Sequence, residues 1–180
     1  MTVPVKLFLL GFGGFWLLFL SLFCLGFRIN ISSSLPLGLY QASFQPVSNH
    51  LNRGSLVLFC LPDSSIMRIA NQRSYLGAGP CPGRTLPLLK PVLAVAGDTV
   101  SIQAHGVKIN DAGLLPQSQR LSQDSQGRVI QGMPNGVYRV KPGEIWVLST
   151  YSPRSFDSRY FGPVPIRDIQ ATVTPIMTGS

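Results

Sequence analysis

Hydrophobic positions along the chain form one long block followed by many short ones. The block covers residues 7–27, an uncharged run that contains six phenylalanines and Trp16. A helix of this length, rising about 1.5 Å per residue, matches the hydrocarbon core of a bilayer, which is about 30 Å thick. A cleavable secretory signal has a shorter apolar region and a more basic start. The pattern favours a retained transmembrane anchor at 7–27 after a tail at 1–6, with cleavage near Ser32-Ser33-Ser34 as the alternative.

Beyond residue 28 the apolar stretches are short and are separated by many of the chain's 15 prolines and 18 glycines. Short runs bounded by turn residues are typical of β-strands. The strands expected on this pattern cover residues 54–60, 90–96, 99–102, 107–109, 136–140, 145–148 and 169–176. One short helix is expected near 64–74, and the polar, Gln/Ser-rich stretch at 110–135 is expected to be an insertion loop. The sequence thus predicts one mostly β domain over residues 28–180, arranged as a barrel or folded sheet.

The charge of the chain is strongly basic but dispersed. Lys and Arg total 15 and Asp and Glu total 7, which gives a net charge of +8. No basic run with interleaved aromatic residues suggests a nucleic-acid groove, so no nucleic-acid partner is expected. An anionic membrane surface accounts for the charge, and membrane lipid is the expected contact. Lys6 and Arg28 flank the apolar block evenly, so the positive-inside rule barely indicates an orientation.

Three cysteines occur, and one of them, Cys24, lies within the apolar block. Cys60 and Cys81 lie in the domain that follows. No Cys-x-x-Cys pair is present, and His50 and His105 are distant in sequence, so no metal site is expected. Outside the cytoplasm Cys60 and Cys81 can form a disulfide, and two unpaired buried thiols are the alternative.

Lys90 stands in an unusual setting, because no other charge occurs between residues 86 and 96. Burial disfavours the ammonium form and lowers the pKa of a lysine, by about 3–5 units at the extreme. A base that works near pH 8 needs a shift of about 2.4 units, or about 3 kcal/mol. Lys90 is therefore a candidate general base. The alternative is a lysine on an edge strand whose amine reaches solvent.

A cluster of three serines, Ser32-Ser33-Ser34, follows the apolar block and precedes an unusually apolar stretch at 35–40. A serine hydroxyl is a weak nucleophile unless a base takes its proton. Neither histidine lies in a suggestive context, and no Gly-x-Ser-x-Gly motif is present. A Ser-Lys dyad is a known variant of the catalytic triad, and Lys90 is the lysine with an apolar setting. A simple linker is the alternative interpretation of the serines.

Three short motifs occur in a suggestive order: Ser32-x-Ser34-x-Pro36-x-Gly38, then Lys90 ahead of the turn Gly97-Asp98, then Asp157-Ser158-Arg159-Tyr160-Phe161-Gly162. Together, and behind an N-terminal apolar block, they resemble the type I signal peptidase family and span nearly the whole domain. The resemblance implies an all-β, membrane-associated serine protease with a Ser/Lys dyad. It also implies that no cofactor is needed.

Matched residue by residue, the resemblance makes Ser34 the nucleophile and Lys90 the general base. Ser32 would supply its hydroxyl to the oxyanion hole, together with the backbone N–H of Ser34. Two donors of this kind stabilise charge that appears only in the transition state. Ser155 would orient the lysine amine.

The same resemblance makes Asp157 and Arg159 a salt bridge that supports the region around Lys90. A solvent-exposed ion pair is the alternative for these two residues.

Several features are more similar to the conjugative-transfer peptidases of the TraF type than to housekeeping enzymes. Leu35 stands where housekeeping members commonly have Met, and the segments at 36–40 and 77–83 look like the conjugative type. The implied function is maturation of a pilin precursor, with a linear or cyclic product. The implied location is the bacterial inner membrane, single-pass, with the catalytic domain on the periplasmic side. A housekeeping signal peptidase and a non-catalytic pilus-assembly scaffold are the alternatives.

Overall fold

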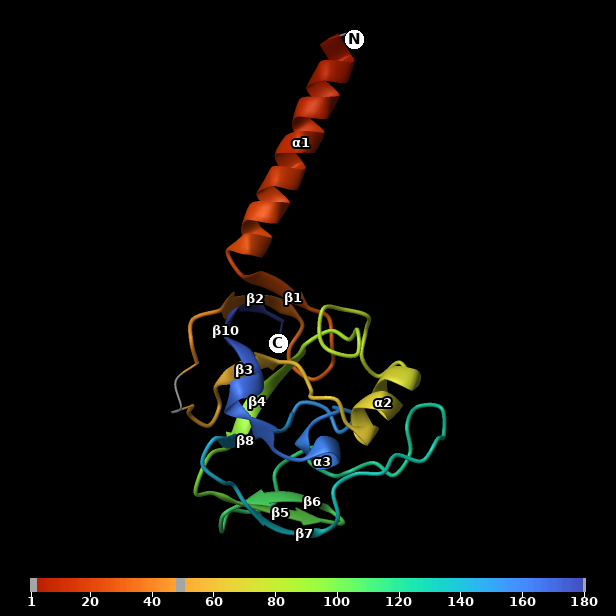
Figure 1. Cartoon of the computed structure of the whole chain (residues 1–180), viewed down its shortest axis with the longest axis vertical. Coiled ribbons are helices and arrows are strands. Elements are labelled where there is room, and N and C mark those ends of the chain that lie inside the picture. Colours follow the sequence, from red (N-terminus) through yellow and green to blue (C-terminus); the bar gives the residue numbers. More distant parts are fainter. Residues whose placement is uncertain (1–2, 48–50, 180) are drawn as a thin grey trace.

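Two antiparallel sheets with helices around them make up this computed structural model (Figure 1). It describes the backbone of residues 3–47 and 51–179 and the side chains of 12–47 and 51–179. The helices are α1 (Val3–Cys24), α2 (Ser65–Gln72) and α3 (Ser158–Phe161), with a 3-10 turn η1 at Ile166–Asp168. The strands are β1 (Phe27–Asn30), β2 (Gly38–Ser43), β3 (Leu56–Phe59), β4 (Leu88–Ala94), β5 (Thr99–Gln103), β6 (Gly106–Ile109), β7 (Gly136–Arg139), β8 (Glu144–Val147), β9 (Val164–Pro165) and β10 (Ile169–Thr178). The mostly β domain expected from the sequence is confirmed.

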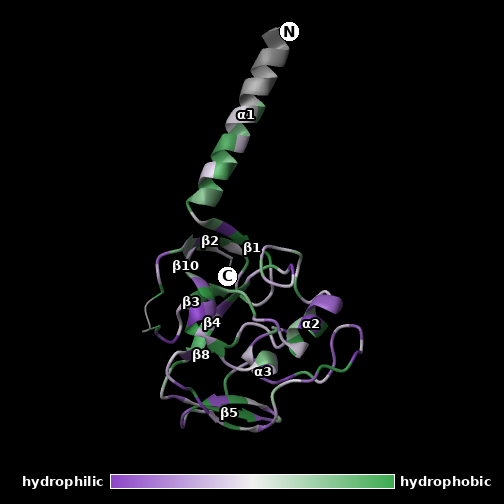
Figure 2. Ribbon diagram, in the orientation of Figure 1, coloured by the Kyte–Doolittle hydropathy of each residue, from purple (hydrophilic) through white to green (hydrophobic). Residues whose placement is uncertain are grey.

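Helix α1 projects away from the β domain, and the described part of its surface is apolar (Figure 2). Large apolar side chains such as Phe15, Trp16 and Leu17 are each more than half exposed, at 64%, 52% and 66%. Within the part of the chain that is described, no helix combines the length and apolar character that a bilayer crossing needs. The anchor expected at 7–27 lies partly outside the described side chains, and it stays a prediction.

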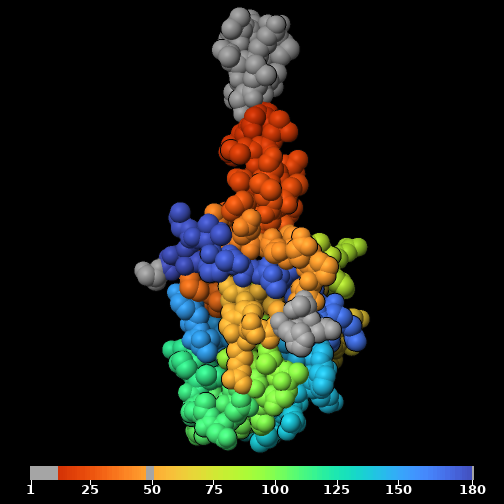
Figure 3. Space-filling view, turned by 90° about the vertical axis from the view of Figure 1, so that its left-hand side faces the viewer, coloured from red at the N-terminus to blue at the C-terminus, as the bar shows by residue number. Residues whose placement is uncertain are grey.

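The larger sheet has seven strands in the order β1-β2-β10-β3-β4-β8-β9. The last strand of the chain, β10, therefore lies between two early strands, pairing with β2 on one side and β3 on the other. In the space-filling view the blue C-terminal segment lies beside the orange β1–β2 region and above the yellow-orange β3 region (Figure 3). This strand joins the β1–β2 hairpin to the β3–β4 pair, so it fixes the two halves of the sheet relative to each other.

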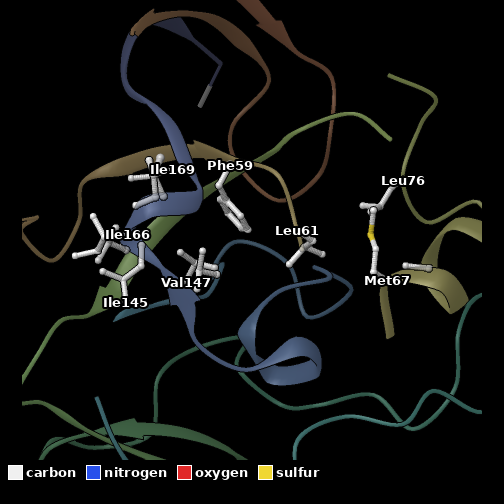
Figure 4. Close-up of a cluster of buried hydrophobic side chains, with 12 residues drawn as sticks. Phe59, Leu61, Met67, Leu76, Ile145, Val147, Ile166 and Ile169 are labelled. Atoms are coloured by element: carbon white, nitrogen blue, oxygen red, sulfur yellow. The ribbon is translucent and has the colours of Figure 1, made fainter. Parts of the chain in front are cut away.

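Three apolar clusters of described residues fill the interior of the β domain, and the smallest packs Tyr40 and Ala42 of β2 against β10. One cluster joins β3, β8 and α2 and includes Phe59, Met67 and Val147 (Figure 4). Another lies against the smaller sheet, which has the order β6-β5-β7, and includes Ile102 and Trp146. Burial of apolar surface at about 25 cal/mol per Å² is the main stabilising term for such clusters. They give the strands around the site a rigid support.

The polar stretch expected as a loop runs between β6 and β7 without a helix or named strand. One isolated bridge, between Gln123 and Val129, closes a small hairpin within it. Asp124 accepts hydrogen bonds from Tyr75 and Arg128, and Arg73 donates to the Val129 carbonyl, so this hairpin is tied to the segment after α2. The stretch is therefore an ordered part of the domain surface.

A disulfide links Cys60 at the end of β3 to Cys81, with a Cα–Cα distance of 5.5 Å. The bonded pair encloses α2, whose first turn is capped by the Ser64 hydroxyl. It also fixes the small hairpin at 77–86 that leads into β4. The alternative of two unpaired thiols does not describe this structure.

Replacing both Cys60 and Cys81 with serine is expected to lower the free energy of unfolding by about 3 kcal/mol, because the crosslink closes a loop of 21 residues in the unfolded chain. Urea unfolding of the full chain measures the change. Cys24→Ser is the matched control, since Cys24 is a free, exposed thiol and its loss should leave the unfolding midpoint unchanged. An equal loss in the control, or none in the double variant, would contradict the expectation.

Candidate active site

Ser34 lies in the loop that connects β1 to β2, and its side chain is 8% exposed. The loop turns sharply at Ser33 and Ser34, just before the buried Leu35. The Ser34 carbonyl accepts a hydrogen bond from the Ser149 hydroxyl at 2.5 Å. Among the described residues the Ser34 backbone N–H has no hydrogen-bond partner, so it is available to a ligand.

Lys90 lies on β4, an interior strand paired with β3 and β8. Side chains alternate across a strand, and Lys90 shares the buried face with Val92 and Ala94. The lysine is 3% exposed. Its Nζ lies 2.5 Å from Ser34 Oγ and 2.8 Å from Ser155 Oγ. The alternative of a solvent-reaching edge-strand lysine is therefore wrong.

The charge state of Lys90 is shifted by its surroundings. Burial lowers the pKa of the amine to about 8; the nearby Asp157 carboxylate opposes this shift and the Arg159 guanidinium adds to it. A lysine with a pKa near 8 is neutral in a useful fraction of molecules at mildly alkaline pH. A neutral amine in contact with a serine hydroxyl can accept its proton.

Asp157 and Arg159 form a buried salt bridge, and both side chains are 0% exposed. Arg159 Nε and Nη2 each lie 2.8 Å from a carboxylate oxygen of Asp157. The remaining guanidinium donors bind the carbonyls of Gln117, Gln119 and Ser155 at 2.8–3.1 Å. All five N–H groups of Arg159 are thus used, and the alternative of a solvent-exposed pair is wrong.

Ser149 was not expected to contribute to the site. Besides its bond to the Ser34 carbonyl, its backbone N–H donates to Asp157 Oδ2 at 3.2 Å. The residue is 1% exposed and bridges the nucleophile loop to the buried salt bridge. Its only sequence signal was its position at the end of the strand that precedes the Ser155–Arg159 segment.

Asn30 is the second residue that sequence reasoning missed. It ends β1, and its side-chain amide lies inside the loop that carries Ser34. The Ser32 hydroxyl donates to Asn30 Oδ1 at 2.7 Å, so the group expected in the oxyanion hole is held by Asn30 in this structure. An Asn-x-Ser spacing at a strand end is a local turn signal that points to such a contact.

The structure connects five of the six expected catalytic and supporting residues through the Ser34–Lys90–Ser155 contacts, the Arg159–Ser155 hydrogen bond and the Asp157–Arg159 pair. The sixth, Ser32, lies in the same loop as Ser34 and is bound by Asn30. Cys60 and Cys81 form a separate crosslink. In the described ranges, no group of three or more His, Cys, Asp or Glu side chains could hold a metal ion. His50 lies outside the described residues.

Comparisons with known proteins show which proteins the chain is similar to. The profile of the family described as "Signal peptidase, peptidase S26" matches residues 4–178. A plasmid transfer protein TraF from Escherichia coli is 36% identical over 169 residues, covering 94% of this chain and 93% of its own. A probable conjugal transfer protein TraF from Sinorhizobium fredii is 39% identical over 154 residues, covering 85% and 78%. A signal peptidase I from Enterococcus faecalis, 20% identical, matches with a TM-score of 0.39 over 69% of this chain and 97% of its own.

Proposed function

The chain belongs to the signal peptidase family S26, and on that premise we propose that it is a serine endopeptidase in which Ser34 is the nucleophile and Lys90 the general base. One observation carries the proposal. The buried Lys90 Nζ lies 2.5 Å from Ser34 Oγ, within the distance that direct proton transfer needs. No histidine takes part in this contact.

In the first step neutral Lys90 accepts the Ser34 proton while Ser34 Oγ attacks the scissile carbonyl carbon. The negative charge moves to the carbonyl oxygen, where the Ser34 N–H and the Ser32 hydroxyl stabilise it. For this the Ser32 hydroxyl turns from Asn30 Oδ1 toward the substrate. The Lys90 ammonium then protonates the leaving amine, and an acyl-enzyme ester on Ser34 remains.

In the second step a water molecule replaces the amine product. Lys90, neutral again, takes a proton from the water as its oxygen attacks the ester carbonyl, and returns the proton to Ser34 Oγ as the ester breaks. Ser155 keeps the amine directed at Ser34 through its contact of 2.8 Å. The pair is thus reset without a metal or cofactor.

The substrate we propose is a membrane-inserted pilin precursor of a conjugative system. Support comes from the relatives, which are plasmid-transfer and conjugal-transfer proteins matched over most of their length. If the amino terminus of the same fragment that is esterified to Ser34 attacks the ester in place of water, the product is cyclic, and Ser34 Oγ leaves and regains its proton. Water outcompetes an amine unless the amine is held close, so cyclisation requires a high effective molarity at the site.

The location we propose is the bacterial inner membrane, with α1 as the anchor and the β domain on the periplasmic side. Two features support this. Exposed apolar side chains surround the described part of α1, and a disulfide such as Cys60–Cys81 persists in an oxidising compartment.

Co-expression with a pilin precursor and, separately, with a general secretory precursor tests the proposed substrate. Mass spectrometry of the products should show trimming of the pilin alone. A product lighter by one water than the trimmed linear peptide would establish cyclisation. Cleavage of both precursors would instead indicate a housekeeping signal peptidase, and cleavage of neither would favour a non-catalytic scaffold.

The rate should depend on pH through Lys90. Only the neutral amine accepts a proton, and the pKa of Lys90 is about 8, so activity should rise with pH and reach a plateau above it. At pH 7, kcat/KM is expected to be about tenfold below the plateau. Steady-state cleavage measured from pH 6 to 9.5 checks this. A flat or falling profile between pH 6 and 9 would exclude Lys90 as the base in a step that limits the rate.

A further inference from the structure

We propose that Asn30 is a positioning residue that sets the shape of the nucleophile loop and the direction of the Ser32 hydroxyl; this role rests on the proposed function. The Asn30 side chain is largely buried, at 9% exposed. Among the described residues the Asn30 side chain forms no hydrogen bond with Ser34 Oγ or with Lys90. It binds backbone carbonyls of the loop, so it acts through the loop backbone.

The amide group of Asn30 organises the loop from its inside. Nδ2 lies 3.1 Å from the Ser32 carbonyl, 3.2 Å from the Leu35 carbonyl and 3.1 Å from the Pro36 carbonyl. Two N–H groups are shared among these three acceptors. The carbonyls come from both sides of Ser34, so a single side chain holds the backbone before and after the nucleophile.

The oxygen of the same amide holds Ser32. Asn30 Oδ1 accepts from the Ser32 backbone N–H at 3.2 Å and from the Ser32 hydroxyl at 2.7 Å. A hydroxyl has one proton to donate, so the hydrogen bond to Asn30 Oδ1 sets the direction of the Ser32 O–H bond before a substrate binds. The backbone contact can persist when the hydroxyl turns toward an oxyanion, and this keeps Ser32 beside the site.

Two other side chains each hold a single carbonyl of the loop. The Tyr40 hydroxyl donates to the Pro36 carbonyl at 2.7 Å, and the Ser149 hydroxyl holds the Ser34 carbonyl. Without Asn30 the carbonyls of Ser32 and Leu35 lose their recorded side-chain partner. The loop would then be free to move by a fraction of an ångström to an ångström relative to Lys90, and displacements of that size can cost about 100-fold in rate.

Asn30→Leu tests the proposal, because leucine fills a similar volume without any hydrogen-bonding group. We expect kcat for precursor cleavage to fall about 100-fold while KM changes less than about threefold, since the loop is displaced but the binding surface is retained. The pH midpoint of kcat/KM should stay where it is in the wild type, because the surroundings of Lys90 are intact. A kcat within about threefold of wild type would overturn the proposal.

Asn110→Ala is the matched control, because Asn110 also uses its amide in a turn, binding the Thr99 N–H and Asp98, but lies at the smaller sheet. It should lose stability while keeping kcat. If Asn30→Leu fails to fold, Asn30→Ser provides the test instead. The serine hydroxyl can replace only one of the N–H donors of the Asn30 amide, so a loss of kcat is still expected. A kcat for Asn30→Ser within about threefold of wild type would likewise overturn the proposal.

Coupling to Ser32 gives an independent readout. In a Ser32→Ala background, Asn30→Leu should cost less than it does in the wild type, since part of its effect passes through the Ser32 hydroxyl. If the fold-losses in kcat of the two single variants multiplied fully in the double variant, the link between Asn30 and the Ser32 hydroxyl would be contradicted. The two proposals remain distinguishable: a wild-type chain that does not cleave refutes the proposed function, whereas a cleaving wild type with unaffected Asn30 variants refutes only the positioning role.

Discussion

Lys90→Met is expected to lower kcat by on the order of 10⁴-fold or more, with Ser34→Ala giving a similar loss. Methionine retains an unbranched stem that suits the apolar surroundings of Lys90, but it removes the one basic atom that contacts Ser34 Oγ among the described residues. Because the two residues act as one unit, the double variant should be little worse than either single variant. Cleavage of a membrane-inserted precursor by purified chains measures the loss.

The matched control is Lys108→Met, which removes a lysine from β6 in the smaller sheet and should leave kcat unchanged. Near-wild-type cleavage by Lys90→Met or by Ser34→Ala would refute the dyad. The same result would direct attention to a different nucleophile within the family fold.

Stability provides a second check on Lys90→Met. Folding lowers the pKa of Lys90 from 10.5 to about 8, so the unfolded chain binds more protons between those values. Wild-type stability should therefore rise as pH increases from 8 to 10.5, by about 3 kcal/mol from this group. Below pH 8 the native state retains a buried ammonium at full cost. The methionine variant should lack this rise and should be no less stable than wild type at pH 7.

Breaking the Asp157–Arg159 pair is expected to lower the free energy of unfolding by about 3–5 kcal/mol. Asp157→Asn leaves the Arg159 guanidinium buried without its counter-charge, while its bonds to the Gln117 and Gln119 carbonyls remain. Arg159→Met leaves the buried carboxylate without its counter-charge and removes the side-chain donor from three backbone carbonyls. Restoring charge balance in the double variant should recover part of the loss. Denaturant unfolding measures each change.

An exposed pair serves as the control. The side chains of Arg68 and Asp63 are 62% and 76% exposed, so Asp63→Asn should change stability by less than about 1 kcal/mol. The buried pair should also act on Lys90. Asp157 raises the pKa of that amine and Arg159 lowers it, so Asp157→Asn should move the pH midpoint of activity down and Arg159→Met should move it up. Equal effects of buried and exposed pairs on stability would contradict this account.

Much of the fold could be predicted from local pattern alone. The strands expected at 54–60, 90–96 and 145–148 correspond to β3, β4 and β8, and the helix expected at 64–74 corresponds to α2. These elements are apolar runs bounded by turn residues, so the signal lies within each segment. The strands β1 and β2 and the short α3 were not expected. Turn-forming Ser, Pro and Gly residues at 32–38 separate β1 from β2, and α3 has only four residues, so the local signals are weak.

The candidate site likewise contains residues that the sequence indicates and contacts that it does not. Lys90 could be identified because a lone charge in an apolar strand is visible in the sequence. The Ser149–Ser34 contact joins residues 115 positions apart, and the carbonyls that bind Arg159 come from a polar loop without a motif. Asn30 is local, but its role depends on how the loop at 30–36 folds back on it. Every residue has a backbone carbonyl, so a contact made by a carbonyl does not depend on residue type and cannot be recognised in the sequence. Such contacts make up most of the site contacts that were not predicted.

The position of β10 determines when the proposed dyad can be aligned during synthesis of the chain. Ser34 and Lys90 both precede β10 in the chain, yet β10 is the strand that holds β2 against β3. A nascent chain carries both halves of the dyad without the element that aligns them. Alignment of the proposed dyad therefore waits until β10 has been synthesised and has paired with β2 and β3.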